Sequence, residues 1–212
     1  MFDQYLSEFL TIALVHLLAV ASPGPDFAII VRQSLVYGKF TALWSSLGVG
    51  CGILVHVFYS LLGIGLIISQ SVLAFSILKF MGALYLIYIG MKSLRAKPLA
   101  GGVQFKQEAK PAPGRMRAIW TGFLTNGLNP KATLFFLSLF TVVINPETPR
   151  TVQAFYGVYM AVATGIWFSC VSLFFSHPRI RSTFQKMGHW LERLTGLVLL
   201  GLGIKLATAN LD

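Results

Sequence analysis

Six stretches of the chain are apolar over nearly the whole length that a helix needs to cross a bilayer. They cover about residues 6–35, 40–68, 72–91, 118–144, 152–176 and 190–208. A helix spans the hydrocarbon core with about 20 residues, and each stretch reaches or nearly reaches that length. The pattern predicts an all-α integral membrane protein with six transmembrane helices.

The first and fourth stretches are each interrupted by helix-breaking residues beside an ionisable side chain. The first break reads Ser22-Pro23-Gly24-Pro25-Asp26, and the second reads Asn126-Gly127-Leu128-Asn129-Pro130-Lys131. Backbone groups freed inside a bilayer are tolerated only where protein buries them or where they line a polar cavity. Paired interruptions in the two halves of a chain indicate the binding site of a transporter. The two breaks are therefore the candidate site.

The chain divides into two halves of three helices each. Residues 93–117 are rich in lysine, arginine, proline, glycine and glutamine, which predicts a basic cytoplasmic loop between a first repeat (1–92) and a second (118–212). The ends of the third and sixth stretches align without gaps, so that Leu84, Gly90 and Lys92 match Leu197, Gly203 and Lys205. Because three is odd, the second copy enters the membrane from the other side, and we predict a 3+3 inverted repeat with the first helix of each half broken.

The basic residues predict the orientation of the chain. Twelve of them fall in the loops after the first, third and fifth stretches and three on the opposite side. The twelve are Arg32, Lys39, Lys92, Arg95, Lys97, Lys106, Lys110, Arg115, Arg117, Arg179, Arg181 and Lys186, and the three are Lys79, Arg150 and Lys205. The cation-rich side should be cytoplasmic, which makes both termini periplasmic and residues 177–186 a short basic loop.

Composition agrees with a membrane protein and accounts for the net charge. Only 11% of the 212 residues are charged and 55% are hydrophobic, whereas a soluble domain carries about 25% charged residues. The net charge of +10 follows from topology and anionic lipid, so no nucleic-acid partner is expected. Cys51 and Cys170 are isolated, and we predict neither a disulfide, a metal site nor a cofactor.

An aspartate and a lysine take the same place in the two repeats. Pro25 and Pro130 suit the first position of a restarted helix, which puts Asp26 and Lys131 in its first turn. A helix N-terminus carries partial positive charge, so it favours Asp26 and disfavours Lys131. A charge at this depth costs about 2.5–3.5 kcal/mol, and Lys131 therefore needs an anion. Asp26 is the acidic residue at comparable depth, and Glu8, near the outer surface, is the poorer alternative.

Two arrangements satisfy these charges. Asp26 and Lys131 could form a permanent ion pair across the pseudo-twofold axis. Alternatively, both face a cavity whose ligand offers an ammonium and a carboxylate, as a zwitterionic amino acid does. Asn126 and Asn129 can cap the restarted helix, or bind substrate or a coupling ion.

These segments resemble the LysE/RhtB family of amino-acid exporters. The resemblance rests on Ser22-Pro23-Gly24-Pro25-Asp26-Phe27, on Thr125-Asn126 with Asn129-Pro130-Lys131-Ala132, and on Gly201-Leu202-Gly203-Ile204-Lys205. It extends over nearly the whole chain, and the Asp after the second Pro looks most like the threonine/homoserine branch. It implies export across a bacterial inner membrane, driven by the proton motive force, with Pro23, Gly24, Pro25, Asp26, Asn126, Asn129, Pro130 and Lys131 as the family's motif residues. Family members differ in substrate, so it does not identify the amino acid.

The leading hypothesis is a proton-coupled exporter of a small, neutral amino acid. Asp26 would bind the substrate ammonium or a proton, and Lys131 the substrate carboxylate. Alternatives are an exporter of basic or of branched and apolar amino acids, an intramembrane enzyme in which Ser22 and His16 imitate a serine–histidine pair, and a metal-ion transporter. The expected partners are the amino acid, protons and the bilayer, and a homodimer is left open.

Overall fold

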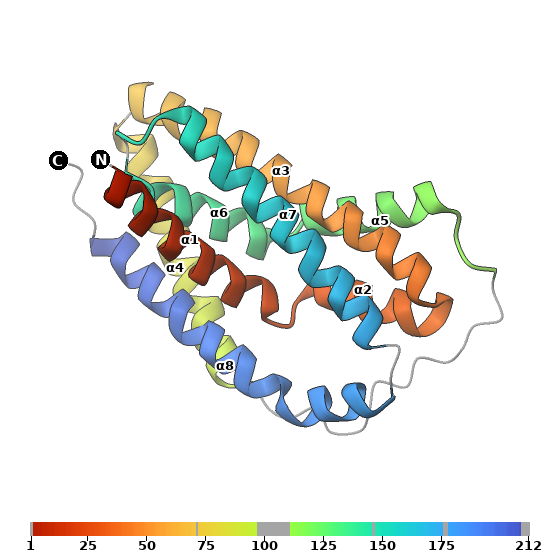
Figure 1. Ribbon diagram of the computed structural model, residues 1–212. Helices are drawn as coiled ribbons and strands as arrows, with labels where there is room; N and C mark the ends of the chain where they lie inside the picture. Colours follow the sequence, from red (N-terminus) through yellow and green to blue (C-terminus); the bar gives the residue numbers. More distant parts are fainter. Residues whose placement is uncertain (1, 71, 97–110, 146, 176–177, 209–212) are drawn as a thin grey trace.

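The computed structural model describes residues 2–70, 72–96, 111–145, 147–175 and 178–208, and the regular structure in these ranges is helical (Figure 1). Its helices are α1 (Phe2–Ala21), α2 (Pro25–Tyr37), α3 (Lys39–Gln70), α4 (Val72–Leu94), α5 (Arg115–Gly127), α6 (Pro130–Val142), α7 (Arg150–Phe174) and α8 (Pro178–Thr208). The all-α prediction is confirmed for this part of the chain.

Both predicted breaks are present. The chain leaves α1 at Ala21 and restarts as α2 at Pro25, with a bend of 54° between the two helices. It leaves α5 at Gly127 and restarts as α6 at Pro130. Each proline opens its helix, where the missing N–H removes no intrahelical hydrogen bond.

Two helices of the described residues are long and apolar enough to cross a membrane by themselves. They are Lys39–Leu62 and Arg150–Phe174, and the bent pair Tyr5–Ala21 with Pro25–Tyr37 passes the same test as one span. Residues 178–186, predicted as a loop, are instead helical and extend α8 toward its N-terminus. That stretch is polar and basic but holds no internal glycine or proline that would break a helix. Most of the predicted central loop (97–110) lies outside the described residues.

The outer surface is apolar and the interior is partly polar, the reverse of a soluble protein. One face of α1 exposes Leu6, Leu10, Leu14 and Leu17, each between 46% and 61% accessible. Buried polar side chains of the described residues include His16, Ser45, His56, Asn126 and Thr164. An apolar exterior of this kind suits lipid, whereas buried polar groups need partners inside the protein.

Glycines bring the backbone of α3 against that of α5. A side chain at Gly48 would collide with the Ile119 carbonyl and the Phe123 amide, and one at Gly122 would collide with the Ser45 carbonyl. The Ser45 hydroxyl crosses the same contact and donates to the Ala118 carbonyl at 3.0 Å. Gly48 and Gly52 are spaced as a GxxxG in the sequence, a spacing that predicts close approach of a neighbouring helix, and the structure confirms that approach at Gly48.

A second glycine contact joins α4 to α8. A Cβ at Gly196 would lie 2.7 Å from the Gly90 carbonyl oxygen, and a Cβ at Gly203 would lie 3.0 Å from the Ala83 carbonyl oxygen. We call this contact the α4–α8 seam. Residues 83 and 90 on one helix thus meet 203 and 196 on the other, so the two helices run antiparallel.

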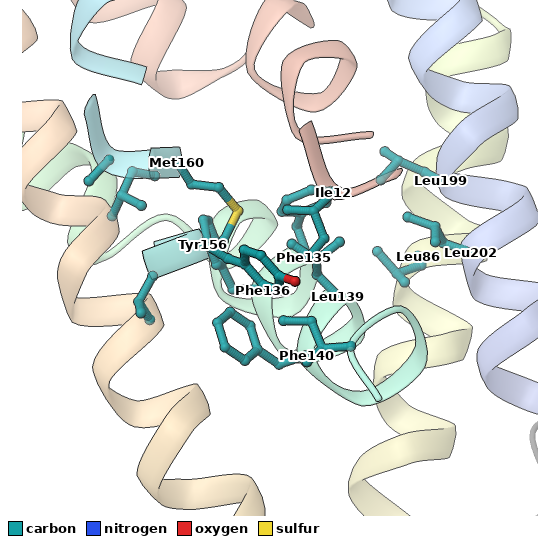
Figure 2. Packing of buried hydrophobic residues seen from close by; sticks show 14 of the residues in the cluster. Ile12, Leu86, Phe135, Phe136, Leu139, Phe140, Tyr156, Met160, Leu199 and Leu202 are labelled. Atoms are coloured by element: carbon teal, nitrogen blue, oxygen red, sulfur yellow. The ribbon is translucent and has the colours of Figure 1, made fainter. Parts of the chain in front are cut away.

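The main hydrophobic cluster lies between the seam and α7. Figure 2 shows Leu86 of α4 and Leu199 and Leu202 of α8 on one side, with Phe136, Leu139 and Phe140 of α6 and Tyr156 and Met160 of α7 on the other. Ile12 of α1 packs into the same cluster and is fully buried. The cluster surrounds α6 and so fixes the helix that begins at the second break.

Candidate functional site

The two breaks meet at one cavity of about 50 Å³. Its polar lining residues are His16, Ser22, Asp26, Asn126, Asn129, Lys131 and Thr164, and its apolar ones include Ile53, Phe27, Phe135, Phe136 and Phe168. The walls thus come from both broken helices, from α3 and from α7. Of the predicted site residues, the structure brings Gly24, Asp26, Asn126, Asn129 and Lys131 to the cavity, while the three prolines shape the backbone around it.

Two asparagines of the second break hold the aspartate of the first. Asn126 Nδ2 and Asn129 Nδ2 each donate to Asp26 Oδ2 at 3.0 Å. The other carboxylate oxygen, Asp26 Oδ1, is buried without a hydrogen-bond partner among the described residues. A buried carboxylate oxygen without a donor is costly, so this atom is the strongest acceptor offered to a ligand.

The lysine of the second break reaches back to the first. Lys131 Nζ donates to Ser22 Oγ at 2.9 Å. Within the described part of the chain no carboxylate lies within ion-pair distance of this ammonium, Asp26 included. The alternative of a direct Asp26–Lys131 ion pair therefore does not describe this structure, although the two charges lie on the wall of one cavity. Ser22 is a partner that the sequence did not indicate.

The two restarted helices are capped differently. Asn129 is the N-cap of α6, and its Oδ1 accepts from Lys131 N at 3.0 Å while its Nδ2 serves Asp26. The capping role considered for Asn129 is confirmed. Asn126 is not a cap; it lies inside α5 with 1% of its surface exposed. At the first break the N-cap is Gly24, which has no side chain to offer.

A histidine and a glycine of α3 position Asn126. His56 Nε2 lies 2.9 Å from the Asn126 carbonyl oxygen, so it must donate, and Tyr59 OH then donates to Nδ1 at 2.6 Å. A Cβ at Gly52 would lie 2.7 Å from Asn126 Oδ1. Gly52 and His56, one turn apart, therefore clamp Asn126 from its side-chain and backbone sides. A single histidine in an apolar stretch gives no sign of this contact in the sequence.

The possible serine–histidine pair is not formed. Ser22 accepts from Lys131, whereas His16 Nε2 lies 3.1 Å from Thr164 Oγ1 of α7. Glu8, the second candidate anion for Lys131, is also engaged elsewhere. Its carboxylate accepts hydrogen bonds from Asn145 N, Thr148 Oγ1 and Tyr156 OH. Within the described ranges, no group of three or more His, Cys, Asp or Glu is arranged to hold a metal ion.

Comparison with known proteins identifies the family of the chain. The model of the LysE type translocator family matches residues 17–210. The threonine efflux protein of Escherichia coli (strain K12) is 32% identical over 210 residues, which cover 95% of this chain and 98% of the relative. The homoserine/homoserine lactone efflux protein of Salmonella typhimurium is 32% identical over 152 residues (72% and 70%), and the leucine efflux protein of Klebsiella pneumoniae 27% over 212 residues (98% and 99%). No solved structure matches.

The resemblance predicted from the two motifs is thus confirmed over nearly the whole chain, and the apolar exterior agrees with it. The chain is a membrane protein and belongs to the LysE type translocator family.

Proposed function

We propose that this protein is an amino-acid efflux transporter that moves a small, neutral, threonine- or homoserine-like amino acid out of the cytoplasm in exchange for protons. One observation carries the proposal. A single cavity presents an unpartnered carboxylate oxygen, Asp26 Oδ1, and an ammonium, Lys131 Nζ, whose hydrogen bond goes to the Ser22 hydroxyl. These two groups complement the ammonium and the carboxylate of a zwitterion.

The ligand would satisfy both charges together. Its ammonium would donate to Asp26 Oδ1, and its carboxylate would accept from Lys131 Nζ and from the N-terminus of α2, which Gly24 leaves uncapped. Its side chain would contact the apolar wall formed by Phe27, Phe135 and Phe168. A cavity of about 50 Å³ favours a small side chain over a long basic one.

Competition at Asp26 would couple the two fluxes. A proton on this carboxylate removes the charge that attracts the substrate ammonium, so proton and substrate exclude each other. Alternating exposure of such a site to the two sides of the membrane gives antiport. The two amide donors hold Asp26 Oδ2 and leave Oδ1 as the oxygen that a proton or the substrate ammonium would bind.

A 3+3 inverted repeat across the cytoplasmic membrane, with both termini periplasmic, is the architecture we propose for this exchange. The α4–α8 seam supports it, because the sequence alignment that matches Gly90 with Gly203 also matches Ala83 with Gly196. The proposed twofold axis would therefore relate the contact between 90 and 196 to the contact between 83 and 203. Figure 1 shows the start of α1 and the end of α8 at the same end of the molecule, as six crossings require.

The relatives carry names with different cargo, namely threonine, leucine and homoserine or its lactone. The main alternative is therefore an exporter of a branched, apolar amino acid, which the phenylalanine-rich wall would also accept. A panel of labelled amino acids separates these two candidates.

Purified protein in proteoliposomes tests the proposal. With an imposed pH gradient, wild-type protein should accumulate a labelled small neutral amino acid, and collapse of the gradient should abolish accumulation. The Asp26→Asn variant should lose at least about 100-fold in gradient-driven transport, equivalent to about 2.7 kcal/mol, while Glu147→Gln, an exposed loop position, should match wild type. Undiminished gradient-driven transport by Asp26→Asn would remove Asp26 from the coupling role.

A further inference from the structure

Helix α8 carries a carboxylate toward the second break. Since α8 begins at Pro178, Glu192 lies in the middle of a helix and not near its start. It precedes Thr195, Leu199 and Leu202 on one helical stripe, and these three residues are 0%, 0% and 8% exposed. Glu192 itself is half-buried, so it continues the inward-facing side of α8 by one turn.

Neighbouring contacts show what this stripe faces. Thr195 Oγ1 donates to the Leu18 carbonyl at 3.0 Å, which places the stripe against the last turn of α1, directly before the first break. Farther along, Leu199 belongs to the same buried cluster as Phe135, which follows Lys131 by one turn of α6. Glu192, one turn before Thr195, is therefore directed to the region where α1 ends and α6 begins.

The charges agree with this placement. Two acidic groups act electrostatically on Lys131, namely Glu192 and Asp26. Glu192 in turn interacts electrostatically with Lys131 and with Lys92 near the end of α4. The adjacent Arg193 is directed elsewhere, because its Nε donates to the Ala96 carbonyl at 3.1 Å. The charge of Glu192 thus reaches both the cavity lysine and a lysine near the end of α4.

We propose that Glu192 is a positioning residue of the translocation site, the counter-charge that offsets the Lys131 ammonium and leaves it available to the substrate carboxylate. A lone ammonium at membrane depth is unstable without an anion. Asp26 accepts hydrogen bonds from Asn126 and Asn129 at Oδ2, and its charge would be neutralised by a proton or by the substrate ammonium in each transport cycle. Glu192 supplies an anion that does not take part in that exchange. This inference rests on the proposed function and assigns the residue that supports Lys131 in binding the substrate carboxylate.

The other ionisable groups near the pair do not offer an alternative anion. His16 of α1 lines the cavity and pairs with Thr164, whereas His56 of α3 lies behind Asn126 and pairs with the Asn126 carbonyl and with Tyr59. Both are neutral or cationic. Without Glu192, Lys131 would have Asp26 as its one acidic neighbour among the described residues.

The Glu192→Gln variant in proteoliposomes tests this role. Transport should fall at least about tenfold at neutral pH, and its pH profile should change on the alkaline side, because the Lys131 ammonium loses the carboxylate that offsets its charge. Glu192→Asp, which keeps the charge, should recover a large part of the activity. Glu147→Gln is the matched control and should leave the pH profile unchanged. A Glu192→Gln profile that superimposes on wild type would overturn the proposal.

A second measurement does not depend on transport. In detergent, Lys131→Met and Glu192→Gln should each lower the midpoint of thermal unfolding. The double variant should lose less than the sum of the two single losses, because it removes both charges together. Additive losses would overturn the pairing. If wild-type protein transports no amino acid, the proposed function fails, whereas the thermal test still decides whether Glu192 and Lys131 are coupled.

Discussion

The two breaks share a proline followed by an ionisable residue, yet they differ in how they are held. The second break is held by its own helix cap and by α3. Asn129 caps α6, and Gly52 and His56 of α3 hold Asn126. At the first break the cap is a glycine, and both hydrogen-bond donors to the Asp26 carboxylate, Asn126 and Asn129, belong to the second break. The comparison teaches that one half of the site is scaffold and the other half is left open for a ligand.

The largest effect should come from separating the scaffold half from α3. The Gly48→Ala variant places a methyl group against the backbone of Ile119 and Phe123, which no side-chain rotation can relieve. We expect a loss of about 3 kcal/mol in unfolding free energy, measured by thermal unfolding in detergent. Gly127→Ala, where an added Cβ meets nothing within 4 Å, is the matched control. Equal stability of the two variants would show that the α3–α5 contact does not hold the second break.

The next largest effect should come from removing Asn126, one of the two donors to the Asp26 carboxylate. Asn126→Ala leaves Asp26 Oδ2 with the single amide of Asn129 and lets the carboxylate move. A hydrogen bond to a charged group is worth about 1.5–3 kcal/mol, so we expect the KM for transport to rise about tenfold or more. Kinetics in proteoliposomes measure this change. An unchanged KM would mean that the first break holds its own aspartate.

Asn129 allows its two roles to be separated. Asn129→Ala removes the cap of α6 and a donor to Asp26, and should cost about 1 kcal/mol of stability as well as substrate affinity. Asn129→Ser can still cap but does not reach Asp26, so it should keep the melting temperature and lose affinity. Parallel melting and transport assays distinguish the two variants. If both variants melt together below wild type, the cap does not depend on the side-chain oxygen.

The smallest structural effect should come from giving the first break a cap like that of the second. The backbone of Gly24 is extended, and an added Cβ would lie 3.7 Å from Lys131 Nζ, an ordinary contact. Gly24→Ser should therefore change stability by only a few tenths of a kcal/mol. Transport should nevertheless fall several-fold, because the serine hydroxyl competes for the N–H groups of α2. Full transport by this variant would place the substrate carboxylate elsewhere.

The sequence predicted local features well and partners poorly. The two breaks, the prolines that open α2 and α6 and the close approach at Gly48 depend on nearby residues, so the local pattern contains them. The hydrogen-bond partners of Asp26 and of Lys131 depend on how helices that are distant in the sequence pack together. Residue type alone does not determine which partner each of them takes. The only acid considered at the depth of Lys131 was Asp26, but Asp26 bonds to two amides and Lys131 to Ser22.

Glu192 was missed for a related reason. The basic residues of 177–186 predicted a loop, which put Glu192 near the start of a shorter final helix. In the structure α8 extends through that stretch, so Glu192 falls in mid-helix on the buried stripe. Neither the extension nor the stripe is visible from composition, because charged residues at a membrane surface occur in both helices and loops.

The α4–α8 seam has a consequence for how freely this sequence can diverge. Positions 83 and 90 on α4 and positions 196 and 203 on α8 are each seven residues apart, about two helical turns. Gly90, Gly196 and Gly203 each face a carbonyl of the opposite helix, and Ala83 supplies one of these carbonyls. A larger side chain at any of these four positions must push the two helices apart. Side chains on the outward faces, such as the exposed leucines of α1, can change without moving a helix. The sequence should therefore change rapidly at exposed positions and very slowly along the α4–α8 seam. The small residues of the α4–α8 seam are the part of the sequence by which distant descendants of this protein would still be recognised.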